Sequence, residues 1–208
     1  MRAVICLLVV ALWATAAQAA DLAVSLRTAK GQPVRDAVVT VYPAAGASGP
    51  VRFDWPYVMA QQNLQFDPFV LVVPAGALVA FPNRDAVRHQ VYSFSPTHPF
   101  ELALYSKDAT RTVRFDKVGV VALGCNIHDS MVAFIKVVDT ALAAKSDRAG
   151  EAGVRAVPAG QATVRIWHPY LKAPGNEIVL SVAMPRDGVL RQSVTLDVRS
   201  PPVRRNAY

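Results

Sequence analysis

Short runs of β-branched and other apolar residues dominate the chain, and helical periodicity is scarce. Apolar and polar positions alternate within many of these runs, and Pro, Gly and Asp separate them, which predicts β-strands joined by turns. The expected strands are residues 22–26, 37–42, 69–73, 78–81, 89–94, 112–115, 119–123, 132–138, 154–157, 163–167, 177–182 and 193–198. The first two, separated by a turn at residues 30–33, are expected to form a hairpin. The pattern predicts an all-β protein.

Two segments that are poor in strand signals divide the chain. Residues 43–50 are rich in Gly, Pro and Ala, and a second soft segment follows residue 140. Residues 51–140 carry strands at the density of an antiparallel Greek-key sandwich. We expect this domain to be inserted into an outer sandwich formed by residues 20–50 and 141–199; the alternative is two consecutive domains. Residues 200–208, rich in Pro and Arg, are expected to form a flexible tail.

The first residues predict export. Arg2 is followed by a short apolar run at residues 4–13 and by small residues, with Ala17-Gln18-Ala19 at a position typical of a cleavage site. We expect residues 1–19 to be a signal peptide and the mature chain to lie in the periplasm. The apolar run is too short for a membrane anchor, and no later segment is expected to span a membrane.

Removal of the signal peptide takes away Cys6 and leaves Cys125 as the single cysteine. An exported protein with one cysteine cannot form an internal disulfide. Cys125 is then a buried inert thiol, half of an intermolecular bridge, or a metal ligand, and its neighbours decide between these possibilities.

The residues around Cys125 favour a metal ligand. Cys125, His128 and Met131 are spaced three apart in a short loop between two expected strands, and His89 begins an upstream strand. A thiolate and two imidazoles with a weak axial thioether form blue, or type 1, copper sites. Each residue type alone more often belongs to a core or a surface, but the combination in an exported all-β chain predicts one copper ion. Zinc is the alternative metal, although a thioether is a poor zinc ligand.

The other two histidines give weaker signals. His98 lies in a Pro-flanked segment, which we expect to be an exposed turn. His168, between Trp167 and Pro169, is expected to hold a turn or a contact between domains rather than a metal.

The ligand motif resembles that of the cupredoxins, the small blue copper proteins related to plastocyanin and amicyanin. The spacing of Cys125, His128 and Met131 is similar to that of amicyanin, and His89 matches the remaining ligand. Longer stretches resemble periplasmic cupredoxin-like proteins of the methylamine utilization type: FPNRDAVRHQVYSFS, FELALYS, FDKVGVVALGCNIHDSMVAFIKVVDT and RIWHP. Two flanking stretches, GQPVRDAVVTVYP and SDRAGEAGVRAVPAGQATVRIWHP, resemble carboxypeptidase-regulatory-like (transthyretin-like) sandwiches, which implies that architecture for the outer sandwich.

Two positions depart from the usual blue copper pattern. Ile127 stands where many such loops carry Pro, so it keeps its N–H; we expect an extra hydrogen bond to the Cys125 sulfur that raises the reduction potential. Gln90 stands where Asn usually follows the first His, so the bond that braces the Cys loop in the family is not predicted here.

These features predict an electron carrier rather than an enzyme. An electron would pass through the edge of His128 during a transient contact with a cytochrome or a periplasmic dehydrogenase. The alternative is copper storage or delivery without electron transfer. A multicopper enzyme would need more than the four histidines present, and no G-x-S-x-G motif of a hydrolase occurs.

Charge changes this picture little. The chain carries a formal net charge of +7, but residues 51–140 contain equal numbers of basic and acidic residues. We interpret the basic surplus as favouring solubility, with attraction to an acidic partner or an anionic membrane as the alternative. No arginine-rich arm or aromatic–basic motif predicts binding to nucleic acid.

Overall fold

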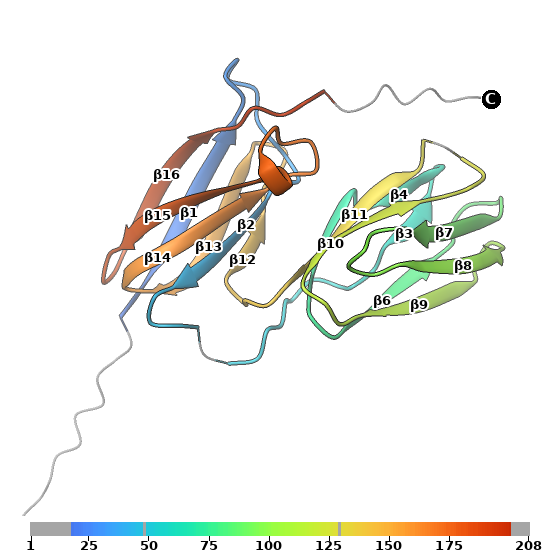
Figure 1. The fold of residues 1–208 in the computed structure, drawn as a ribbon, viewed down its shortest axis with the longest axis horizontal. Helices are drawn as coiled ribbons and strands as arrows, with labels where there is room; N and C mark the ends of the chain where they lie inside the picture. Colours follow the sequence, from blue (N-terminus) through green and yellow to red (C-terminus); the bar gives the residue numbers. More distant parts are fainter. Residues whose placement is uncertain (1–17, 48, 129, 201–208) are drawn as a thin grey trace, which may run out of the picture.

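The computed structural model describes residues 18–47, 49–128 and 130–200, and the predicted all-β class is confirmed (Figure 1). The strands are β1 (Ala19–Arg27), β2 (Val38–Pro43), β3 (Ala60–Gln62), β4 (Gln65–Asp67), β5 (Val70–Pro74), β6 (Ala77–Pro82), β7 (His89–Ser93), β8 (Phe100–Tyr105), β9 (Thr110–Phe115), β10 (Gly119–Gly124), β11 (Val132–Val138), β12 (Ala143–Lys145), β13 (Glu151–Pro158), β14 (Gly160–Trp167), β15 (Glu177–Met184) and β16 (Val189–Thr195). The 3₁₀ turn η1 (Pro174–Asn176) precedes β15. Within the described ranges, no helix has the length and apolar character needed to cross a membrane.

Strands from both ends of the described chain form one sandwich, called here the outer sandwich (β1, β2 and β12–β16). One sheet has the order β13-β1-β16 and the other the order β12-β2-β14-β15. Strand β1 shows why they pack: Leu22, Val24 and Leu26 alternate with more exposed residues and are fully buried against the opposite sheet. Removing such apolar side chains from water drives the two sheets together.

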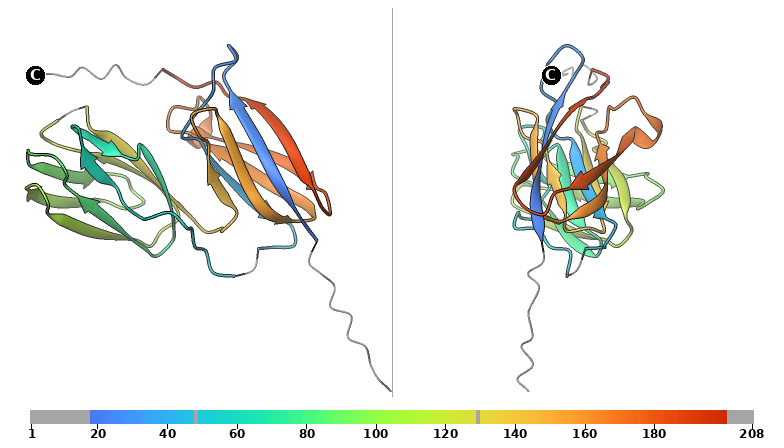
Figure 2. Two further views of the ribbon diagram at one scale, coloured as in Figure 1. Left: turned by 180° about the vertical axis from the view of Figure 1, so that it is seen from behind. Right: turned by 90° about the vertical axis from the view of Figure 1, so that its left-hand side faces the viewer.

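Strands β3–β11 build a second unit, called here the inner module (residues 60–138), which lies beside the outer sandwich (Figure 2). Its main sheet has the order β5-β11-β10-β7-β8, and the pairs β6-β9 and β3-β4 form two small sheets. The side chains of Phe81, Phe115 and Ile135 are fully buried in its core. Because β7 and β10 are neighbours in the main sheet, the start of β7 and the loop after β10 meet at one end of the module.

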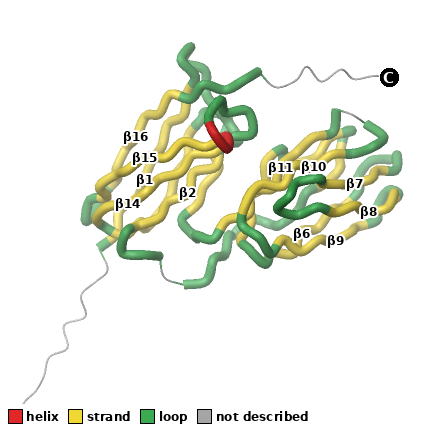
Figure 3. The backbone as a smooth tube through the Cα atoms, viewed as in Figure 1, coloured by secondary structure: helices red, strands yellow, loops and turns green. Residues whose placement is uncertain are grey.

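The two units contact each other through an apolar cluster and are joined by two loops (Figure 3). Val38 and Trp167 of the outer sandwich pack with Val70, Val72 and Val138 of the inner module. All five side chains are buried, so the contact resembles part of a protein core rather than a flexible linker.

The predicted hairpin between the first two strands is wrong. Strand β1 pairs with β13 and β16, whereas β2 pairs with β12 and β14 in the opposite sheet. The chain does turn back after β1, because Arg27 bridges to Pro33 and the Val34 N–H donates to the Leu26 carbonyl. Asp36 then adopts a left-handed backbone with φ of 62°, and the chain crosses to the other sheet.

Candidate metal centre

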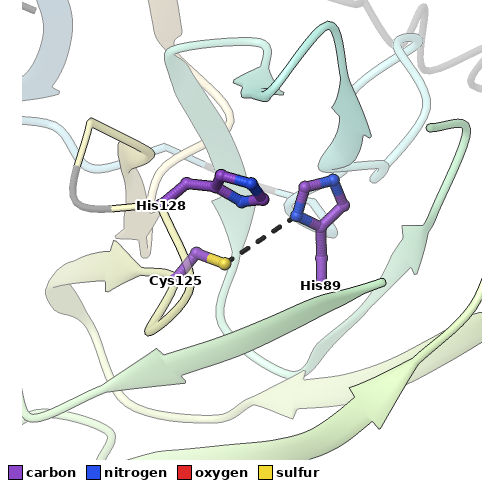
Figure 4. Close-up of side chains that lie close together, drawn as sticks. All are labelled: His89, Cys125 and His128. Carbon is purple, nitrogen blue, oxygen red and sulfur yellow. Dashed lines mark hydrogen bonds between the residues drawn. The ribbon is translucent and has the colours of Figure 1, made fainter. Parts of the chain in front are cut away.

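His89, Cys125 and His128 converge at one end of the inner module (Figure 4). His89 is the first residue of β7, Cys125 directly follows β10, and His128 lies in the loop between β10 and β11. A ring nitrogen of each histidine and the Cys125 sulfur all lie within 4.8 Å of one another. Strands β7 and β10 pair through Tyr92 and Gly124, which brings these ligand-type atoms together although 36 residues separate His89 from Cys125.

The fourth residue singled out from the sequence, Met131, is also buried. Its side chain belongs to the same apolar cluster as Cys125, and its N–H donates to the His128 carbonyl at 2.9 Å. This bond closes the end of the loop that carries Cys125 and His128. Met131 therefore lies at the end of the loop that carries Cys125 and His128, directly before β11.

His128 carries an unusual buried atom. Among the described residues, its Nδ1 is a buried side-chain nitrogen without a hydrogen-bond partner. Burying such a group unpaired costs about 1–3 kcal/mol. The ring lies beside His89, with centroids 5.1 Å apart, and beside the Cys125 sulfur. A metal ion would use the free lone pair, and a donor set of one thiolate and two imidazoles fits copper.

The surroundings of Cys125 favour its thiolate. Burial raises the pKa of the thiol, but the His89 ring, the backbone N–H groups of Gln90 and Ile127 and the neighbouring His128 ring outweigh burial and lower the pKa to about 6. The His89 Nδ1 lies 3.8 Å from the sulfur. Since the thiolate is the form that binds metals, these contacts already hold the sulfur in its reactive state at neutral pH.

Asp85 holds the other side of the His89 ring, with 2.8 Å between Asp85 Oδ2 and His89 Nε2. Burial lowers the pKa of His89, but its contacts with Cys125 and Asp85 outweigh burial and raise the pKa above the usual value. Burial likewise raises the pKa of Asp85, but the N–H groups of Leu64 and Asn63 and the His89 ring bring it below the usual value. Sequence analysis gave Asp85 no role, although a carboxylate four residues before a candidate ligand was an available signal.

The two departures from the blue copper pattern have clear structural outcomes. Gln90 does brace the Cys loop, because its Oε1 accepts a bond of 2.7 Å from the Asn126 side chain, and its Nε2 donates to Glu101. The backbone N–H of Ile127 helps to lower the pKa of the Cys125 thiol, and its effect on the reduction potential stays a prediction. Gln90 therefore contacts the loop through Asn126, and Ile127 keeps an N–H near the sulfur.

The remaining histidines lie away from the centre. His98 is in a turn, as expected, but it is half-buried rather than exposed, because its ring packs against Phe100 and Phe115. His168 is buried at the turn after β14, where its Nδ1 accepts the N–H of Tyr170. Burial lowers the pKa of His168 to about 4, so the ring is neutral at pH 7 and serves the turn.

Comparison with known proteins gives a limited result. No protein-family model and no curated protein matches the chain. Similar solved structures include a purple cupredoxin from Nitrosopumilus maritimus, 22% identical over 36% of this chain and 84% of that one, with a TM-score of 0.34. A reduced mutant form of amicyanin is 19% identical over 50% of this chain and 99% of that one, with a TM-score of 0.38.

A third similar structure is the copper-containing nitrite reductase NirK from Thermus scotoductus SA-01. It is 24% identical over 56% of this chain, with a TM-score of 0.39, and the match spans only 28% of the reductase. With identities and TM-scores this low, the likeness carries no weight for function, and the chemistry of the site depends on its own donor atoms.

We predict that Cys125 ionises near pH 6 in the folded apoprotein and near its ordinary value of 9.0 in the unfolded chain. A group whose pKa falls on folding adds stability above its unfolded pKa and loses it as the pH falls through its folded pKa. This contribution should therefore grow between pH 6 and pH 9. Thiolate absorbance in the ultraviolet measures the titration, with Cys125→Ser as the control. A folded midpoint near 9 would contradict the prediction.

Proposed function

We propose that the protein binds one copper ion, in a type 1 site, through His89, Cys125, His128 and Met131, and that it carries single electrons between redox partners. The observation that carries this proposal is the unpaired, buried Nδ1 of His128 beside the Cys125 thiolate and the His89 ring. Copper bound to such donors cycles between its two oxidation states without binding a substrate.

The protein holds the proposed ligands in place before any metal arrives. The His89 ring is fixed by Asp85, and the loop that carries Cys125 is held by the bond between Asn126 and Gln90. Ligands held by bonds of this kind need little rearrangement when the charge at the centre changes, which suits rapid electron exchange. A storage or delivery site, the alternative function, gains less from such rigidity.

The surface next to the centre offers an exit for the electron. His128 is half-buried, whereas its neighbour Ile127 is 50% exposed. We propose that a cytochrome or a periplasmic dehydrogenase makes a brief contact there, through a small interface. Whether methylamine metabolism is involved depends on the identity of that partner.

We also propose the organisation expected from the sequence. Residues 1–19 would be a signal peptide for export to the periplasm, and most of them lie outside the described residues. Residues 51–140 would form the copper domain within an outer sandwich of residues 20–50 and 141–199, of the carboxypeptidase-regulatory-like type. The sharing of sheets between β1, β2 and β12–β16 supports the insertion.

We predict that the mature protein takes up one equivalent of copper and becomes intensely blue, because the colour arises from copper–thiolate bonding. Cys125→Ser should abolish the colour, whereas His98→Gln, at a histidine away from the centre, should preserve it. Visible absorption and metal analysis measure both effects, and voltammetry tests electron transfer. A colourless protein that releases Cu(I) readily would favour storage or delivery instead.

We predict that Met131→Leu keeps the blue colour and raises the reduction potential, because the axial thioether helps to tune that potential. For a one-electron couple, each 1.4 kcal/mol lost from the oxidised state raises the potential by about 59 mV. Met59→Leu is the matched control, since Met59 is buried in the same apolar cluster. Equal potentials in the two variants, measured by voltammetry, would remove Met131 from the ligand set.

We predict that Ile127→Pro lowers the reduction potential, because Pro has no N–H to donate to the Cys125 sulfur. A hydrogen bond to a charged group contributes roughly 1.5–3 kcal/mol. Only the part by which the bond favours the reduced state over the oxidised state changes the potential, so the fall should be on the order of 59 mV or less. Ile127→Ala keeps the N–H and removes the apolar side chain, so its potential should stay close to that of the wild type. An unchanged potential in Ile127→Pro would count against the role of this bond.

A further inference from the structure

Asp85 gathers three N–H donors around one buried carboxylate. Its Oδ2 lies 2.8 Å from Nε2 of His89, and its side chain is only 12% exposed. Its Oδ1 accepts the N–H of Asn63 at 2.6 Å, and its Oδ2 accepts that of Leu64 at 3.0 Å. A carboxylate surrounded by donors in this way is held in one orientation.

The two nitrogens of the His89 ring face different chemistry. Nε2 faces the Asp85 carboxylate, and Nδ1 lies 3.8 Å from the Cys125 sulfur. A neutral imidazole has one N–H and one free lone pair, and an ionised carboxylate can only accept. A protonated ring donates to both acceptors, but a neutral ring has one hydrogen, and the Asp85 carboxylate at 2.8 Å is a closer acceptor than the Cys125 sulfur at 3.8 Å. In the neutral ring Asp85 therefore holds the hydrogen on Nε2, which leaves the Nδ1 lone pair directed toward the sulfur.

The support for Asp85 comes from two separate segments. Asn63 and Leu64 form the tip between β3 and β4, and their left-handed backbones, with φ of 56° and 55°, accompany two N–H bonds to the same carboxylate. On the other side, the buried side chain of Asn83 accepts the Asp85 N–H at 2.9 Å and donates to the Val87 carbonyl at 2.8 Å. The loop that leads into His89 is thus fixed at both ends.

We propose that Asp85 is a positioning residue for His89: it holds the ring in the tautomer with hydrogen on Nε2, directs Nδ1 into the metal centre, and increases the electron donation of the ring. A negative charge at this place favours the oxidised form of a bound metal and lowers its reduction potential. The effect on the potential rests on the proposed copper site, whereas the effect on the tautomer belongs to the apoprotein.

The alternative role for Asp85 is to hold the β3–β4 tip alone. A purely structural role would change stability but would leave the His89 tautomer and the potential unchanged. The two roles are therefore separated by measurements made on the ring and on the bound metal rather than on folding.

The experiment uses three variants of the mature protein. Asp85→Ala removes the acceptor, and Asp85→Asn removes the charge at nearly constant size. Asp108→Asn is the matched control, because Asp108 is exposed, its N–H donates to the carbonyl of Asn83, and its φ of 62° is one that Asn tolerates. Nitrogen NMR of the apoprotein, at a pH where the ring is neutral, reports the His89 tautomer, while copper titration and voltammetry report affinity and potential.

The proposal expects a single Nε2–H tautomer in the wild type and in Asp108→Asn, and a mixture of tautomers in Asp85→Ala. It also expects copper affinity to fall about 10- to 100-fold in Asp85→Asn, with a reduction potential above that of the control. An Nε2–H tautomer that persists in Asp85→Ala, with Asp85→Asn matching Asp108→Asn in affinity and potential, would overturn it. If the wild type never turns blue but the tautomer still depends on Asp85, the electron-carrier function fails and the positioning role stands.

Discussion

The pairing of β7 with β10 is the constraint on which the candidate metal centre depends. These strands place a histidine at the start of one strand beside a cysteine just after the end of the other. Gly124 leaves room for the ring of its partner Tyr92, since an added Cβ would lie 2.6 Å from that ring. A larger residue at this position would have to displace the Tyr92 ring, directly before the loop that begins with Cys125.

Burial of polar ligand groups has a cost that the inner module offsets. His89 and Cys125 are almost completely buried, and the Nδ1 of His128 has no hydrogen bond. Each such group loses contact with water, and only some are compensated by bonds to Asp85, Gln90 and Ile127. The apolar core around Phe81, Phe115 and Ile135 supplies the remaining stability. An arrangement that keeps one uncompensated atom at its centre is best explained by a ligand that uses it.

The sequence predicted the residues of the candidate site, but it did not predict Asp85 and the β3–β4 tip that support His89. The reason for this difference is physical. The Cys125, His128 and Met131 motif is local, and alternation predicted most of the longer strands, although β8 was missed and β16 begins at Val189 rather than at residue 193. The strands β3 and β4 have three residues each, too few for a periodic signal, and their role depends on distant bonds to Asp85. The hairpin prediction was also wrong. The chain turns back after β1, as in a hairpin, but the backbone at Asp36 then directs β2 into the opposite sheet. Local sequence patterns predict individual strands. Which strands pair, and which polar groups bond to each other, depends on contacts between residues far apart in the sequence.

The β3–β4 tip lies between the candidate metal centre and a cleft that the outer sandwich borders. A cleft of about 670 Å³ lies between the two units, and Asn63 lines it together with Arg35, Asp36 and His168 of the outer sandwich. The same Asn63 donates its N–H to Asp85, which contacts His89. Since burial keeps His168 neutral at pH 7, Arg35, Asp36 and Arg199 provide the charge on that wall of the cleft. The outer sandwich therefore borders the segment that supports His89, the proposed metal ligand.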